Sequence, residues 1–322
     1  PFTLTEEQET AINRIQASLE ETPTTKVFLL EGVTGSGKTE IYLQALAFAI
    51  NRGKRGLFLV PEISLTPQLI QRLSSRFPGR VGLWHSGLTA GQQYDTWWRI
   101  LKGDFDIVLG SRSAIFTPVK DLGIIVIDEE HEWAYKQQDT SPRYHVRSVA
   151  EKLMEIEGAV LILGSATPDV ETYYKGLKGD YEILRLRSRI ISGSTDQYRI
   201  GELATVKIVD MREELKVGVR SIFSRMLEKS LIETLDRGEQ AILFLNRRGS
   251  SWSIQCRDCG HVLVCRGCNA PLNYHGLQNK LVCHYCGRST KTQTNCPRCK
   301  GPHIRYLGLG TQRVVQEVEQ KF

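Results

Sequence analysis

The sequence predicts an α/β protein with a doubly wound parallel sheet, followed by a partial second α/β region. Three observations support this prediction. Short apolar runs alternate with helical patterns over about 180 residues, as strands and crossover helices do. One of these runs leads directly into GVTGSGKT at residues 32–39, and all eight cysteines lie within residues 256–299.

The glycine-rich loop has the surroundings that a P-loop needs. An apolar run at 27–30 is typical of a strand buried on both faces, and a helical pattern begins directly after Thr39. Glycines allow backbone N–H groups to turn toward phosphate oxygens at a helix N-terminus. We therefore expect ATP to bind at Gly32, Val33, Thr34, Gly35, Ser36, Gly37, Lys38 and Thr39. In such a loop the lysine, Lys38, reaches the β- and γ-phosphates, and the Thr39 hydroxyl holds Mg²⁺.

A helix is expected to open at Thr5, with Gln8 three residues later. This spacing is that of a capping box, in which the two side chains bond each other's backbone N–H groups. The alternative is that Gln8 faces the adenine of a bound nucleotide, just upstream of the P-loop. We place Gln8 with the ATP-binding residues.

Further elements follow the P-loop helix in order. Strands are predicted at 57–61, 81–84, 106–110, 123–128 and 159–163, and helices at 65–77, 89–101 and 146–156. Residues 180–199 are polar and irregular, which suggests a hinge. Beyond them we expect a strand at 206–209, a helix at 222–237, strands at 241–245 and 304–307, and a helix from Thr311.

These elements suggest three parts. The first lobe is expected at residues 1–185, and part of a second lobe at 186–252 and 304–322. The cysteine-rich module is expected at 253–303, as an insertion in the second lobe. Polar groups should collect at the carboxyl ends of the parallel strands.

An acidic motif, Asp128-Glu129-Glu130-His131, ends the apolar run at 123–128. An ATPase of this class needs one acid to hold Mg²⁺ and a second to orient the attacking water. Asp128 and Glu129 suit these catalytic roles together with Lys38, although acidic residues are also common where a strand simply ends. His131 is expected to sense the nucleotide state.

The motif GSATP at 164–168 follows the next predicted strand. Its hydroxyl residues, Ser165 and Thr167, are expected to bond toward the acidic motif and couple nucleotide state to another surface. A second interpretation is a helix N-cap, with Thr167 as the cap and Pro168 in the first turn.

Aromatic and cationic side chains alternate directly after the acidic motif, and an arginine lies in the strand-end loop GSRSA. Such a surface stacks unpaired bases and binds a phosphate backbone. The alternative is that the aromatic residues are buried at the sheet edge. The expected DNA contacts are Trp133, Tyr135, Lys136, Arg143, Tyr144 and Arg112.

The cysteines form four CxxC pairs, which strongly indicates zinc. Two pairs separated by fourteen residues make an inner zinc ribbon: Cys265, Cys268, Cys283 and Cys286. The outer pairs remain for a second, nested site: Cys256, Cys259, Cys296 and Cys299. Gly260, Asn269, Gly287 and Gly301 follow the pairs closely and tolerate the positive φ of such turns.

The formal net charge is +6, and residues 253–303 carry seven Lys or Arg against one acid. Two thiolate-bound Zn²⁺ would lower this local charge to about +2, so the balance allows a nucleic-acid partner without requiring one. No apolar run approaches the ~18 residues of a membrane span, and the N-terminal residues do not resemble a signal peptide. These patterns suggest a soluble, intracellular protein.

The motifs together resemble those of the superfamily 2 DNA helicases, and most closely the bacterial replication-restart helicases. The residues that carry the resemblance are GVTGSGKT, DEEH with its aromatic-rich loop, GSATP, FLNRRG at 244–249, the eight cysteines and LGLGTQRV at 307–314. The resemblance extends over nearly the whole chain. The acidic motif combined with eight cysteines is specific to this family.

The resemblance implies a RecA-like motor lobe and ATP-driven 3′-to-5′ unwinding of stalled or abandoned forks. It implies Mg²⁺ and two nested Zn²⁺ sites as cofactors. It also implies these partners: single-stranded and forked DNA, the single-stranded DNA-binding protein, and primosome and helicase-loading proteins. The expected location is the cytoplasm, at the nucleoid.

The sequence departs from the family pattern in three places. An N-terminal DNA-binding region, the later second-lobe motifs with their arginine finger, and a C-terminal domain are all missing from the residues at hand. We therefore expect an internal fragment that binds ATP but hydrolyses it weakly, because an arginine finger contributes about 10³-fold or more in rate. Two other classes are weighed: a zinc-stabilised docking module with a passive nucleotide-binding lobe, and an RNA helicase.

Overall fold

The computed structural model describes residues 4–21, 26–138, 141–192, 198–201, 204–219, 221–245, 254–275, 280–306 and 311–322. The chain divides into two compact units, Pro1–Ala204 and Thr205–Phe322. The division falls later than residue 185, where we expected the first lobe to end.

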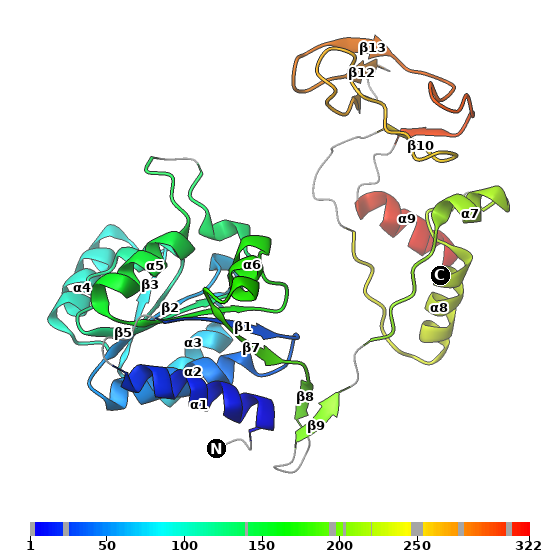
Figure 1. Ribbon diagram of the computed structural model, residues 1–322. Coiled ribbons are helices and arrows are strands. Elements are labelled where there is room, and N and C mark those ends of the chain that lie inside the picture. Colours follow the sequence, from blue (N-terminus) through cyan, green and yellow to red (C-terminus); the bar gives the residue numbers. More distant parts are fainter. Residues whose placement is uncertain are drawn as a thin grey trace. The chain divides into compact units, whose positions relative to one another are not determined.

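A seven-stranded parallel sheet forms the centre of the first unit, in the order β3-β4-β2-β5-β6-β1-β7 (Figure 1). This confirms the predicted α/β class. The strands are β1 (Lys26–Gly32), β2 (Arg55–Leu59), β3 (Val81–Trp84), β4 (Ile107–Gly110), β5 (Leu122–Asp128), β6 (Val160–Ser165) and β7 (Glu182–Leu186).

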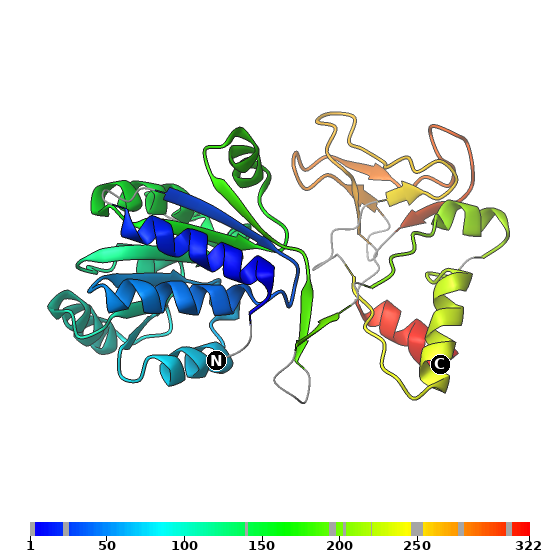
Figure 2. The ribbon, with the colours of Figure 1, turned by 60° about the horizontal axis from the view of Figure 1, so that its bottom comes forward.

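Helices cover both faces of this sheet (Figure 2). One hydrophobic core packs under α1 (Glu6–Glu20), α2 (Lys38–Asn51) and α3 (Pro67–Arg76). The opposite core includes residues of α4 (Ala90–Lys102) and α5 (Val146–Glu157), and α6 (Val170–Lys178) also packs on this side. Successive residues of β1 face opposite cores, which explains its uninterrupted apolar run.

The irregular structure predicted for 180–199 is wrong for the residues that the structure describes, and the hinge stays a prediction. β7 joins the sheet beside β1, and Leu184 and Leu186 are buried. The hairpin of β8 (Arg189–Ser192) and β9 (Tyr198–Gly201) follows. Polar residues mislead here because β7 lies at the sheet edge, where one side of the strand faces solvent.

Side chains at the N-termini fix where several helices begin. Thr5 and Gln8 form the predicted capping box of α1, and Thr89 forms another with Gln92 at α4. At α6 the cap is Asp169, whose side chain accepts from the N–H of Glu171. The interpretation of Thr167 as this cap is therefore wrong.

The second unit contains three helices among its described residues: α7 (Met211–Lys216), α8 (Arg225–Asp236) and α9 (Thr311–Lys321). The helices predicted at 222–237 and from Thr311 are confirmed. The strands predicted at 206–209 and 241–245 do not form among the described residues. Their apolar side chains are exposed there, including Ile208 (94%) and Ile242 (95%). A strand needs a neighbour to bond its N–H and C=O groups, and neither segment pairs with a described residue.

The cysteine-rich module consists of very short strands. β10 (Ile254–Cys256) pairs with β14 (Ile304–Tyr306), and a second sheet contains β11 (Asn273–His275), β12 (Lys280–Val282) and β13 (Ser289–Lys291). The strand at 304–307 was expected to resume the second lobe. Instead β14 closes the module by pairing with its first strand.

The described part of the first unit also contains three short 3₁₀ turns, at Glu62–Ser64, Arg112–Phe116 and Trp133–Tyr135. Across the described residues, no helix is long and apolar enough to cross a membrane.

Candidate nucleotide site and zinc sites

The predicted nucleotide-site residues meet at one edge of the sheet. Strands β5, β6 and β1 are neighbours in the order of the sheet, and all three run parallel. The P-loop leaves β1, Asp128 ends β5 and Ser165 ends β6. Motifs that lie far apart in sequence are therefore brought together at the carboxyl ends of adjacent strands, as expected.

The P-loop turns through two glycines in the left-handed region, Gly35 (φ 80°) and Gly37 (φ 84°). No described residue accepts a hydrogen bond from the N–H groups of Gly35, Gly37 or Lys38. The Lys38 ammonium donates to the carbonyl of Gly32 at 2.9 Å. Free backbone donors at the start of α2, with a cation beside them, form a site for an anion.

The Ser36 hydroxyl is a second group in the P-loop that could bind a phosphate oxygen. This hydroxyl is buried and has no hydrogen-bond partner among the described residues. Buried hydroxyls are normally paired, because desolvation without a partner is costly. The loop residues thus suit phosphate oxygens as ligands.

The Gln8 side chain joins the start of α1 to the P-loop. Its amide oxygen accepts from the N–H of Thr5 at 3.0 Å, and its amide nitrogen donates to the carbonyl of Ser36 at 3.0 Å. The side chain is buried, and a methyl group at Gly37 would lie 2.3 Å from its Nε2. Gln8 therefore caps α1 and bonds to the backbone of the P-loop, and its contact with adenine stays a prediction.

Asp128 is held by two buried tyrosines that the sequence did not single out. The Tyr42 hydroxyl on α2 donates to Asp128 Oδ1 at 2.9 Å, and the Tyr135 hydroxyl donates to the Asp128 carbonyl at 2.7 Å. Burial raises the pKa of Asp128, as does the charge of Glu129, whereas Tyr42 and Lys38 lower it. The charge of Lys38 therefore favours the ionised form of Asp128.

Gly164 on β6 is required by this arrangement. A Cβ atom at Gly164 would lie 1.6 Å from the Tyr42 hydroxyl, far inside contact distance. The first residue of the GSATP motif is therefore glycine because the tyrosine that bonds Asp128 occupies its side-chain position. In sequence, only the aromatic residue within the P-loop helix could have signalled this contact.

Glu129 and His131 continue the acidic motif in a strained turn. Glu129 has a φ of 47°, which is uncommon for a residue with a side chain. His131 Nδ1 lies 3.7 Å from the Glu129 carboxylate and 2.7 Å from Ser165 Oγ. Thr167 joins them through its N–H, which donates to Ser165 Oγ at 2.9 Å, and the structure thus brings the three expected coupling residues together.

Glu130, to which we gave no role, anchors the motif in the protein interior. Its carboxylate is 1% exposed and accepts from Arg147 (3.1 Å), the Thr172 hydroxyl (2.9 Å) and the Asp169 N–H (2.7 Å). This network ties the acidic motif to α5 and to the start of α6. From the sequence, a glutamate within an acidic run is expected to be exposed. Only the tertiary structure shows that Glu130 is buried.

The expected DNA contacts separate into two groups. Trp133 is 75% exposed, and Arg143 is also exposed. Lys136 and Tyr144 are half-buried, and the Tyr144 ring packs edge-on against Phe116 at 5.0 Å. The exposed members remain available to a ligand.

Two of the expected DNA contacts, Tyr135 and Arg112, make contacts within the protein instead. Tyr135 is 1% exposed, so its ring is not open to stack on a base, and this part of our prediction is wrong. The Arg112 guanidinium donates to the carbonyls of Ala134 and Lys136 at 3.1 and 3.0 Å. Arg112 therefore holds the loop that contains Trp133 and Tyr135 against the end of the sheet.

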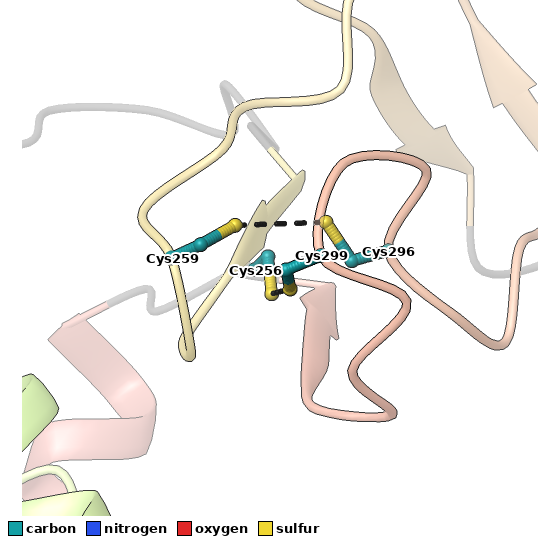
Figure 3. A group of neighbouring side chains, drawn as sticks. All are labelled: Cys256, Cys259, Cys296 and Cys299. Carbon is teal, nitrogen blue, oxygen red and sulfur yellow. Dashed lines mark hydrogen bonds between the residues drawn. The ribbon is translucent and has the colours of Figure 1, made fainter.

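The cysteines gather into the two predicted groups. In the outer group, Cys256 lies 3.6 Å from Cys299 and Cys259 lies 3.7 Å from Cys296, sulfur to sulfur (Figure 3). In the inner group, Cys265–Cys286 and Cys268–Cys283 lie at 3.6 and 3.4 Å. Sulfurs that each lie about 2.3 Å from a tetrahedral Zn²⁺ are separated by similar distances, whereas disulfide sulfurs are about 2.05 Å apart.

All four CxxC turns have the same backbone geometry. The residue after each second cysteine has a positive φ, and its N–H donates to the carbonyl of the first cysteine at 2.9 Å. In the fourth turn this residue is Lys300 (φ 62°) and not Gly301, which corrects our expectation. Gly301 is needed for space, because a Cβ there would lie 2.0 Å from an Asp258 oxygen.

Backbone N–H groups point at the sulfurs, as in metal-binding turns. The N–H of Gly267 donates to Cys265 Sγ at 3.4 Å and lowers the pKa of the Cys265 thiol to about 6. Stabilised thiolate is the form that binds zinc. The donor set therefore suits two Zn²⁺ ions.

Two motifs of the resemblance fall partly outside the described residues. Within FLNRRG, residues 246–249 are not described, and within LGLGTQRV, residues 307–310 are not described. They remain sequence predictions.

Comparison with known proteins identifies the class. Residues 5–175 match the model of the DEAD/DEAH box helicases, and residues 265–291 match that of the PriA DNA helicase Cys-rich region. The first match covers more than half of the chain. The chain belongs to the DEAD/DEAH box helicase family.

Within this family, the chain is similar to replication restart protein PriA. It is 48% identical to that of Bacillus subtilis over 99% of the chain, 46% identical to that of Synechocystis over 91%, and 39% identical to that of Chlamydia pneumoniae over 100%. The chain spans 38%, 35% and 42% of the length of these relatives, respectively.

Proposed function

We propose that this chain is the ATP-binding core of a replication restart DNA helicase. In this role it drives 3′-to-5′ unwinding at stalled or abandoned forks. The observation that carries the proposal is the P-loop: the N–H groups of Gly35, Gly37 and Lys38 have no acceptor among the described residues, and the Lys38 ammonium lies beside them at the Gly32 carbonyl. The similarity to replication restart proteins over 99% of the chain supports the biological role.

The nucleotide is ATP with Mg²⁺ in this proposal. The Thr39 hydroxyl and the Asp128 carboxylate would hold the Mg²⁺ ion, which would neutralise charge at the transferred phosphate. Glu129 orients the attacking water. Tyr42 and Tyr135 fix Asp128 before nucleotide arrives, so little reorganisation is needed.

Coupling runs from Glu129 to Ser165 through His131. The distances of 3.7 and 2.7 Å from the His131 ring to these residues support a continuous polar path. Single-stranded and forked DNA is the partner, and the exposed Trp133 and Arg143 are the contacts that we retain.

The two Cys₄ groups each hold one Zn²⁺ and shape a docking module. In this proposal the protein works in the cytoplasm, at the nucleoid, with the single-stranded DNA-binding protein and with primosome and helicase-loading proteins. Its similarity to replication restart proteins supports this role.

The test compares Lys38→Ala with Cys265→Ser in nucleotide and fork-DNA binding. We expect Lys38→Ala to abolish Mg·ATP binding while both zincs remain, and Cys265→Ser to lose one zinc while Mg·ATP binding persists. Wild-type protein that fails to bind ATP would refute the proposal. Loss of fork binding in Cys265→Ser alone would favour the docking module with a passive lobe.

A further inference from the structure

Residues 186–190, between β7 and β8, run along the P-loop and are bonded to its backbone. The N–H of Val33 donates to the carbonyl of Leu186 at 3.1 Å. The N–H of Ile190 donates to the carbonyl of Gly35 at 2.9 Å. Both ends of this segment are therefore fixed to the loop.

The middle of the segment is held from the other side by α1. The Glu7 carboxylate accepts from the N–H of Arg187 at 2.8 Å and from that of Ser188 at 3.4 Å. Charged acceptors make stronger hydrogen bonds than neutral ones. The backbone of residues 186–190 therefore has a defined place beside the loop.

Each loop glycine faces a side chain of this segment. Added Cβ atoms would lie 3.2 Å from Leu186 at Gly32, 3.4 Å from Arg189 at Gly35 and 3.4 Å from Ile190 at Gly37. The two apolar side chains cover the ends of the loop. The arginine lies at its exposed middle.

Arg189 is free to bind a ligand at this position. Its side chain is exposed, it has no ion-pair or hydrogen-bond partner among the described residues, and its Nε lies 3.5 Å from the Cβ position of Gly35. By contrast, the neighbouring Arg185 is paired with Glu31 at 3.0 Å. The Gly35 N–H also has no acceptor in the part of the chain that the structure describes, so a backbone donor and a guanidinium lie at the same point of the loop.

We infer that Arg189 binds the terminal phosphates of the nucleoside triphosphate held by the P-loop. This inference rests on the proposed function and adds a phosphate ligand from outside the helicase motifs. A guanidinium donates to two phosphate oxygens at once, and its charge complements theirs. Because Ile190 is bonded to Gly35, the contact also links nucleotide binding to the β8–β9 hairpin.

The experiment measures the affinity of fluorescent ATP and ADP analogues with Mg²⁺ in four proteins: wild type, Arg189→Gln, Arg189→Lys and Arg187→Gln. Arg187 is exposed on the same segment, so its variant makes the same charge change without facing the loop. We expect Arg189→Gln to weaken ATP binding about 5- to 20-fold, Arg189→Lys to recover part of it, and Arg187→Gln to change it less than about twofold.

Melting temperatures without nucleotide serve as the folding control and should agree among the four proteins. Equal losses in Arg189→Gln and Arg187→Gln, or no loss in either, would overturn the inference while leaving the proposed function intact. If wild-type binding is itself absent or does not depend on Lys38, the proposed function fails and the inference fails with it.

Discussion

The first unit and the cysteine-rich module are stabilised by different means. The sheet of the first unit is enclosed by two large apolar cores, in which most strand residues are fully buried. Among its described residues, the cysteine-rich module has one small hydrophobic cluster, of which Cys265 and Cys283 are themselves members. A chain segment this short buries too little apolar surface to fold alone, so metal ligands replace the core.

The largest difference between the two regions should appear on removal of zinc. Cys265→Ser should unfold the inner zinc site, and chelation should unfold the whole module, because a structural Zn²⁺ contributes about 10–16 kcal/mol of apparent binding free energy. Zinc content and limited proteolysis measure this loss. The first unit should keep its ATP affinity.

Tyr285→Ser is the matched control, since Tyr285 is 84% exposed between two ligands of the same site. It should retain both zincs. If the module resisted proteolysis without zinc, it would not depend on metal for its stability, and the proposed difference between the two regions would be wrong.

The next largest effect should come from the buried ion pair of the first unit. Arg147→Met leaves the buried Glu130 carboxylate without its cation and should lower the free energy of unfolding by about 3–5 kcal/mol. Chemical denaturation measures the change. The double variant Glu130→Gln with Arg147→Met should recover part of the loss.

Lys152→Met tests whether any ion pair on α5 would behave in the same way. Lys152 pairs with Glu155 at the surface, where both side chains are exposed. The expected change is within about 0.5 kcal/mol. Similar losses for Lys152 and Arg147 would show that burial is not the cause.

A smaller loss is expected from Gly164→Ala, also in the first unit. The new methyl group meets the Tyr42 hydroxyl, and such overpacking costs about 1–3 kcal/mol or more. Thermal unfolding measures the effect, and Mg²⁺-dependent ATP affinity should fall with it, because Asp128 loses its fixed partner. Gly91→Ala is the control: nothing lies within 4 Å of its Cβ position, so it should be neutral or slightly stabilising. Equal losses at both glycines would refute the steric explanation.

The smallest effect tests the backbone of the module. Lys300→Gly relieves a left-handed conformation and should stabilise the outer zinc site by about 0.5–1 kcal/mol. Zinc retention against a competing chelator detects this gain. Gly301→Ala, one residue later, should weaken retention because it displaces Asp258. If Lys300→Gly also weakened retention, the φ argument would be wrong.

Several parts of the fold could be predicted because their signals are local. The strand at 81–84 and the start of α4 at Thr89 follow from apolar runs and capping residues. The cysteine groups follow from spacing alone. β7 and β14 were misassigned because their place depends on which strand they pair with, and pairing partners are distant in sequence.

The sequence by itself determined the chemistry of this protein: a phosphate-binding loop, an acidic motif at a strand end and two sets of thiolates. These functions need particular residue types at short spacing, so they remain visible without coordinates. Only the tertiary structure decided which side chains support them. Tyr42 bonds Asp128, Gln8 bonds the carbonyl of Ser36 in the P-loop, and Arg189 lies at Gly35. Each of these contacts joins residues from different elements, and long-range packing leaves no periodic or local pattern in the sequence.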